Sequence, residues 1–133
     1  MKKKIILIST ASVIVFCLIN CRGLKLEHEE ARNLPLNEIY FTNLNDGTYI
    51  GEYEGGMYKW RVCTVEILVT SGKVRNIEML GTSDPGAENT SDSLLFDRVV
   101  KAQSLQVDVI SGATLTSKAY LKAVEKALER AQK

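Results

Sequence analysis

The 133-residue chain has few histidines and cysteines, with one and three respectively. His28 is its one histidine, and the glutamates around it form a charge run that is typical of a solvated surface. The glycines at positions 51, 55 and 56 lack the strand–turn–helix context of a nicotinamide-binding fingerprint. We therefore expect neither a metal centre nor an independent dehydrogenase.

Basic residues and cysteines are also scarce outside the N-terminus. Residues 1–20 contain three lysines, and without them the formal net charge changes from +1 to −2, which offers nucleic acid no basic surface. Cys17 and Cys21 belong to the N-terminal segment, so Cys63 is left without a partner for an intramolecular disulfide. Because Cys63 alternates with apolar residues in a strand pattern, it is predicted to point into the core; a redox-active thiol is the alternative.

The N-terminus has the form of a secretory signal. Three lysines precede an apolar run from Ile5 to Ile19, which is too short for a comfortable transmembrane helix. The run ends in Leu18-Ile19-Asn20-Cys21, which resembles a bacterial lipobox, whose cysteine is acylated and becomes the mature N-terminus. We expect a lipoprotein-type signal peptide over residues 1–20, lipidation at Cys21, a tether over 21–45 and one domain over 46–133. An uncleaved signal anchor is the alternative, and both place the domain at the extracytoplasmic face of the cell membrane.

The domain shows strand patterns first and helix patterns later. Alternation and turn residues predict strands over 48–53, 61–70 and 73–80, and a further short strand over 106–110. Apolar residues at helical spacing predict helices over about 92–103 and through the C-terminal segment, where residues 119, 123, 124, 127, 128 and 131 form the apolar stripe. This order favours an α+β fold, with a small antiparallel sheet and two helices packed on one face.

The segment from Asp108 to Ser117 stands just ahead of the last helix and is rich in hydroxyl side chains. The start of a helix offers unpaired backbone N–H groups and the positive end of the peptide dipole, which suit a phosphate. The plainer interpretation is an ordinary helix start, with Ser or Thr as the N-cap and Gly112 in a turn.

This segment resembles the flavinylation motif of the FMN-binding domain family, whose members include one component of the sodium-translocating NADH:quinone reductase and one component of the Rnf complex. The motif reads Asp, two residues, Ser/Thr, Gly, Ala, Thr/Ser, any residue, Ser/Thr. The residues that match it are Asp108, Ser111, Gly112, Ala113, Thr114 and Thr116. The resemblance covers about residues 45–131. It implies that Thr116 carries FMN through a phosphoester bond.

The resemblance also implies roles for the other motif residues. A separate flavin transferase, which uses FAD and magnesium, would modify Thr116. Gly112 would let the backbone approach the phosphate, while Ser111 and Thr114 would donate hydrogen bonds to it or cap the helix. Asp108 would either act during the modification or orient the loop through an Asx turn.

An isoalloxazine ring needs apolar and aromatic contacts with a few polar groups. Tyr53, Tyr58, Trp60 and the loop around Asp84-Pro85-Gly86 are the candidates. For Trp60, packing over the sheet is favoured over flavin stacking. Tyr40 and Phe41 are expected to dock the tether on the domain.

The resulting hypothesis is a membrane-tethered flavoprotein that carries covalent FMN and passes electrons within a respiratory or reductase system. Its expected partners are the flavin transferase and redox proteins at the membrane, with no nucleic acid. Two alternatives remain, namely a non-redox lipoprotein binding module and a reductase that holds FMN without a covalent bond.

Overall fold

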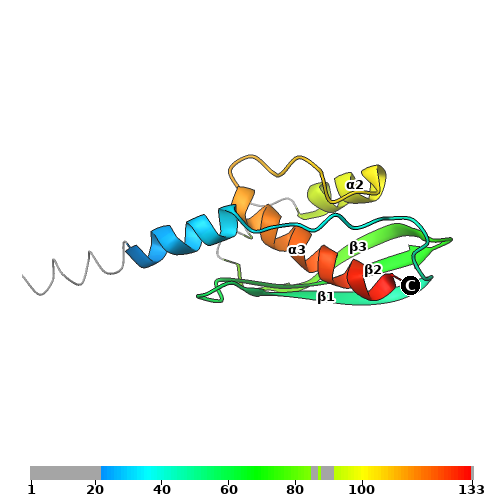
Figure 1. Ribbon diagram of the computed structural model, residues 1–133, viewed down its shortest axis with the longest axis horizontal. Coiled ribbons are helices and arrows are strands. Elements are labelled where there is room, and N and C mark those ends of the chain that lie inside the picture. Colours follow the sequence, from blue (N-terminus) through cyan, green and yellow to red (C-terminus); the bar gives the residue numbers. More distant parts are fainter. Residues whose placement is uncertain (1–21, 85–86, 88–91, 133) are drawn as a thin grey trace, which may run out of the picture.

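A computed structural model describes residues 22–84, 87 and 92–132 (Figure 1). Three strands form one antiparallel sheet in the order β1-β2-β3, with β1 over Gly47–Gly55, β2 over Arg61–Thr70 and β3 over Lys73–Thr82. The predicted strand over 61–70 is confirmed at both ends, and the other two are confirmed with small extensions. The turn at Ser71-Gly72 joins β2 to β3, and the Asp46 carboxylate accepts hydrogen bonds from both backbone N–H groups of this turn.

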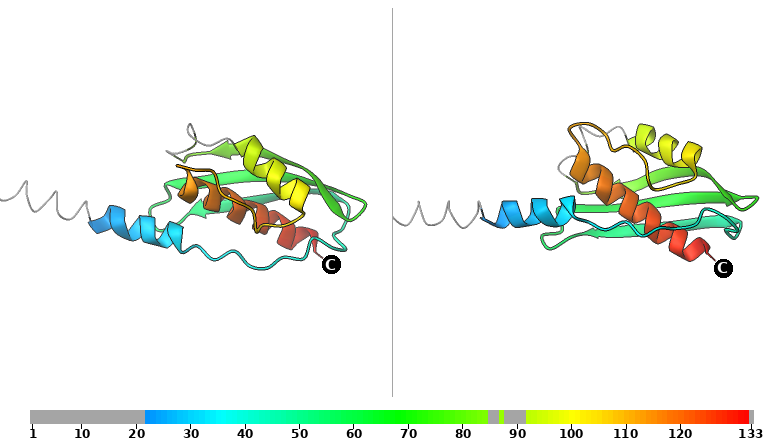
Figure 2. Two further views of the ribbon diagram at one scale, coloured as in Figure 1. Left: turned by 90° about the horizontal axis from the view of Figure 1, so that it is seen from above. Right: turned by 45° about the horizontal axis from the view of Figure 1, so that its top comes forward.

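Two helices cover one face of the sheet, as Figures 1 and 2 show. Helix α2 spans Asp92–Ala102 and α3 spans Thr114–Ala131. The core lies between them and the sheet, and it includes Cys63, Val65 and Ile67 from β2, all fully buried. The predicted α+β fold is therefore confirmed.

Helix α3 approaches β1 very closely at Gly51. A Cβ atom at Gly51 would lie 2.0 Å from the carbonyl oxygen of Ala123 and 2.4 Å from the backbone nitrogen of Ala127. Small residues on both elements thus allow backbone-to-backbone contact. This contact fixes the depth at which α3 lies on the sheet.

The prediction of a short strand over 106–110 is wrong. This segment has no regular structure and runs along the helices instead of pairing with the sheet. Side chains bind several of its backbone groups: Arg98 Nη1 donates to the carbonyl oxygen of Asp108, and the Ile110 N–H donates to Ser117 Oγ at 3.1 Å. Val107, Val109 and Ile110 still pack against the core, which explains the apolar pattern that suggested a strand.

The segment before β1 packs on the domain. Residues 22–32 form a helix, and the chain then runs along α3 toward β1 (Figure 2). Phe41 and Leu44 join the core, whereas Tyr40 is 74% exposed, so only Phe41 of the predicted docking pair is buried. The boundary between tether and domain stays a prediction.

The remaining N-terminal predictions, including lipidation at Cys21, fall on residues 1–21, outside the described residues. Among the residues that are described, no helix combines the length and apolar character needed to cross a membrane.

Candidate functional site

The motif residues form a tight turn that leads directly into α3. The backbone N–H of Ala113 donates to the carbonyl oxygen of Ile110 at 3.0 Å, and Gly112 between them has a φ of +79°. This left-handed conformation favours glycine. A Cβ atom at Gly112 would meet nothing within 4 Å, so the turn borders open space. The backbone here is accessible to an incoming phosphate group.

The first turn of α3 has no side-chain cap. Ala113 is the N-cap residue, and no side chain forms a hydrogen bond there. The first intrahelical bond runs from the Ser117 N–H to the Ala113 carbonyl oxygen at 2.8 Å. The N–H groups of residues 114–116 precede it and are available to an anion, which the helix dipole also attracts. Ser111 and Thr114 are exposed beside this start, but neither caps it, so that part of their expected role is wrong.

Thr114 and Thr116 lie on different faces of the helix. Two residues along an α-helix correspond to a rotation of about 200°. Thr114 is exposed, whereas Thr116 is only 4% exposed and faces the sheet together with Tyr120. The two motif hydroxyls are therefore not equivalent, and Thr114 is the one at the surface of the helix start.

Asp108 is exposed and lies in the segment that precedes the turn. Its backbone carbonyl is held by Arg98, but within the described part of the chain its carboxylate forms no hydrogen bond. An Asx turn at Asp108 is therefore not found. The carboxylate is available for a role in modification.

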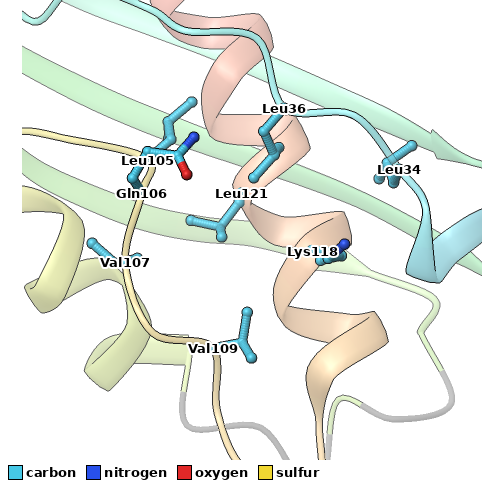
Figure 3. A pocket seen from close by; sticks show the side chains of 8 residues that line it. All are labelled: Leu34, Leu36, Leu105, Gln106, Val107, Val109, Lys118 and Leu121. Carbon is cyan, nitrogen blue, oxygen red and sulfur yellow. The ribbon is translucent and has the colours of Figure 1, made fainter.

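A groove of about 290 Å³ lies beside α3 (Figure 3), and one of its lining residues, Lys118, is one helical turn beyond Thr114. Three segments form its walls: the chain before β1, the segment after α2, and α3. The lining residues are Leu34, Leu36, Leu105, Gln106, Val107, Val109, Lys118 and Leu121. Six of these eight residues are aliphatic, whereas Lys118 and Gln106 contribute polar side chains, and about half of the groove's surface is polar.

Comparison with known proteins identifies the family. The model of the FMN-binding domain matches residues 59–129, which is more than half of the chain. The chain belongs to the FMN-binding domain family. The match covers β2, β3, α2, α3 up to residue 129, and the whole motif.

Two relatives are much longer than this family member. An uncharacterized protein of Treponema pallidum is 33% identical over 91 residues, which are 67% of this chain and 24% of that protein. A urocanate reductase of Eggerthella lenta is 34% identical over 67 residues, which are 50% of this chain and 11% of the reductase. The chain thus spans a quarter or less of the length of these relatives.

A crystal structure of a Clostridium perfringens protein shares the fold. Its TM-score is 0.53 at 23% sequence identity, and the alignment covers 66% of this chain and 88% of that one. This likeness concerns the fold alone.

The aromatic residues that were predicted to contact the flavin ring of this FMN-binding domain lie away from the groove. Tyr58 and Trp60 belong to the turn between β1 and β2, where their ring centroids are 5.3 Å apart. Trp60 is 38% exposed, and neither it nor Tyr58 or Tyr53 lines the groove beside the motif. Asp84 is buried near Arg61, and Pro85 and Gly86 lie outside the described residues.

Sequence reasoning missed the groove. The spacing of Thr114, Lys118 and Leu121, at i, i+4 and i+7, is the signal that could have found its α3 wall. Nothing in the sequence pattern indicates that Leu34 and Leu36 complete it from a segment about 80 residues away.

Cys63 is a core residue rather than a reactive thiol. Its side chain is fully buried, and Sγ donates to the carbonyl oxygen of Ala119 at 3.5 Å. Burial, with a smaller contribution from the charge of Asp84, raises the pKa of the Cys63 thiol to about 12. The prediction that it points into the core is confirmed. Within the described residues, no three His, Cys, Asp or Glu side chains are grouped as a metal site.

Proposed function

We propose that this member of the FMN-binding domain family carries FMN covalently at the start of α3 and relays electrons outside the cytoplasm. The observation that carries the proposal is the exposed Thr114 hydroxyl at a helix start that no side chain caps. A phosphate bonded there meets free N–H groups and the positive end of the helix dipole. The family match supports the cofactor itself.

Thr114 is the better attachment point, and we propose it in place of Thr116. A transferase must reach the hydroxyl oxygen, and the attached phosphate must then lie in solvent or against the N–H groups. Thr116 is 4% exposed and faces the sheet, so its modification would require the first turn of α3 to open. Thr114 needs no such rearrangement, and it also occupies a Ser/Thr position of the motif.

The modification is a group transfer from FAD, carried out by a separate flavin transferase with magnesium. The threonine oxygen bonds to the phosphorus of the FMN half, the pyrophosphate bond breaks, AMP leaves, and the hydroxyl proton passes to a base. A threonine hydroxyl is a poor nucleophile at neutral pH, so it needs activation. The exposed Asp108 carboxylate, in the same loop, is suited to accept the proton or to help hold the magnesium ion.

We also propose that the domain is tethered to a membrane by its N-terminus. Three observations support this proposal. The apolar run over residues 5–19 precedes the helix of residues 22–32. That helix contacts the turn between β1 and β2, since the Met57 N–H donates to Glu30 Oε2 at 3.3 Å. Exposed apolar side chains occur on the helix, at Leu24 and Leu26, and on the turn that it contacts, at Met57, Tyr58 and Trp60. Aromatic side chains of this kind favour a membrane–water interface.

The bound flavin would supply the redox chemistry, accepting and donating one or two electrons, while the protein holds it in place. A redox role is supported by the urocanate reductase, a protein named for a reduction, which contains a region similar to this chain. The electron donor and acceptor are then separate proteins at the membrane.

Mass spectrometry of four proteins tests the attachment. The wild type, Thr114→Ala, Thr116→Ala and Thr114→Ser are each produced together with a flavin transferase. We expect one added FMN on the wild type, on Thr116→Ala and on Thr114→Ser, and none on Thr114→Ala. Fragment ions should assign the added mass to residue 114.

Two results would overturn this proposal. Loss of FMN in Thr116→Ala but not in Thr114→Ala would return the attachment to Thr116. An unmodified wild type that releases flavin on mild acid denaturation would indicate non-covalent FMN. Circular dichroism of each variant checks that the fold is intact, since loss of one threonine hydroxyl at a helix start costs only about 1 kcal/mol.

A further inference from the structure

We propose that the groove lined by Leu34, Leu36, Leu105, Val109, Lys118 and Leu121 holds the isoalloxazine ring of the flavin. This inference rests on the proposed attachment at Thr114 and names the ring-binding part of the same site. It also assigns one wall of that part to residues before β1, which lie outside the region that matches the family.

The first argument is placement. Thr114, Lys118 and Leu121 follow one another on one face of α3, at i, i+4 and i+7. With a rise of 1.5 Å per residue, Lys118 lies about 6 Å along the helix axis from Thr114. The ribityl chain of FMN separates ring and phosphate by a comparable stretch. A ring that extends along α3 from Thr114 would therefore reach the groove.

The second argument is the chemistry of the lining. Apolar side chains come from all three walls, and they suit the two faces of a flat ring system (Figure 3). Lys118 and Gln106 can serve its polar edge. The Lys118 ammonium group donates to the carbonyl oxygen of Arg32, so it is held at the mouth of the groove. A cation at this place would favour the electron-rich reduced flavin.

The third argument is that the neighbouring groove is a poor alternative. It lies on the other side of the 105–109 segment and is larger, about 500 Å³. Four of its six lining residues have charged or polar side chains: Arg98, Lys101, Gln106 and Asp108. Only one aliphatic side chain larger than alanine would contact the ring there.

Hydrogen bonds hold the N-terminal wall of the groove against α3. Lys122 Nζ donates to the carbonyl oxygen of Pro35 at 2.8 Å. The backbone N–H and the side-chain amide of Asn37 donate to the Glu125 carboxylate at 3.0 and 2.9 Å. Glu125 is fully buried by these contacts. Leu34 and Leu36 are thus held against α3 before any ring binds, so the site is preorganised.

One experiment measures ring exposure in the flavinylated protein, using acrylamide as a neutral quencher of flavin fluorescence. Leu36→Asp places a charge in the groove, and Leu94→Asp makes the same change at an exposed position on α2. If the groove buries most of the ring, the wild-type quenching constant should be about three- to tenfold below that of free FMN. Leu36→Asp should raise it toward the free value, whereas Leu94→Asp should leave it unchanged. Equal constants in all three proteins would overturn the proposal, provided that circular dichroism shows folded protein.

A second experiment separates this proposal from the attachment itself. Thr114→Ala protein, which has no proposed acceptor, is titrated with free FMN while amide chemical shifts are recorded. Shifts over residues 34–36, 105–109 and 118–121 would support the groove even if no covalent flavin ever forms. Shifts confined to the helix start, to residues 98–102 or to the turn at 56–60 would overturn it, whatever the result of mass spectrometry.

Discussion

The two long faces of α3 are built in different ways. Its inner face, with Thr116, Tyr120, Ala123 and Ala127, is buried and approaches the sheet closely at Gly51. Its outer face, with Thr114, Lys118, Lys122 and Glu125, meets a chain segment from before the sheet through hydrogen bonds and charges.

This difference explains how one helix can serve both stability and function. Apolar contact on the inner face depends on shape and tolerates little change of volume. Polar contacts on the outer face fix a segment at defined points and leave grooves between them. The proposed attachment and ring sites both lie on the outer face, where chemistry can be added without disturbing the core.

The largest expected effect is a break in the inner face. Gly51→Ala would place a methyl group within the backbone of α3, at 2.0 Å from the Ala123 carbonyl oxygen. Because backbone atoms cannot move aside as a side chain can, we expect a loss of about 3 kcal/mol or more in the free energy of unfolding. Urea denaturation measures it.

Gly81→Ala is the matched control for this change. Gly81 also lies in a strand of the same sheet, and a Cβ atom there would meet nothing within 4 Å. Its free energy of unfolding should change by less than about 1 kcal/mol. Equal losses in the two variants would show that the close approach of β1 and α3 is not the reason why position 51 requires glycine.

The inner face was also the part that sequence could predict. The apolar stripe of α3 and the alternation over 61–70 both report burial against a single large partner, the sheet and helix layers of one domain. The local periodicity of apolar residues is therefore enough to predict this burial. For this reason the three strands of the sheet, both helices and the inward direction of Cys63 are confirmed.

The outer face could not be predicted in the same way. Glu125 lies outside the apolar stripe, which indicates solvent, yet it is fully buried because Asn37 covers it from 88 residues away. The motif also does not say which of its two threonines faces outward. That depends on where α3 starts relative to the sheet. The strand predicted over 106–110 failed for a related reason, since its apolar residues pack on helices.

The second prediction tests how much the outer face depends on its buried charge. Glu125→Gln keeps the shape but removes the charge that accepts from Lys122 Nζ at 2.7 Å and from two Asn37 donors. We expect a loss of about 2 kcal/mol in the free energy of unfolding, because Lys122 is left with a weaker partner in a partly buried place. Hydrogen exchange over residues 33–44 should also become faster.

Glu129→Gln provides the control on the same helix. The Lys126–Glu129 pair has the same i, i+3 spacing and a similar distance of 2.8 Å, but both side chains are exposed, at 45% and 38%. Solvent weakens such a pair, so the change should be within about 0.5 kcal/mol. If Glu129→Gln costs as much as Glu125→Gln, burial by the N-terminal segment is not the source of the effect.

The smallest expected effect returns to the inner face, through pH. Burial raises the pKa of Cys63 from the ordinary 9.0 to about 12. The folded protein therefore keeps the thiol proton at pH 10, while the unfolded chain releases it. This contribution to stability is complete below pH 9 and is lost as the pH rises toward 12. Between pH 8 and pH 10 the wild type should lose about 1 kcal/mol more than Cys63→Ala, as measured by urea denaturation at both pH values. Burial raises the pKa of Tyr53 and of Tyr120, and the charge of a Cys63 thiolate also raises it, but the folded protein keeps this thiol neutral at pH 10, so the comparison isolates Cys63. An identical pH dependence would mean that water reaches the inner face of α3, and the contrast between its two faces would then be weaker than the packing indicates.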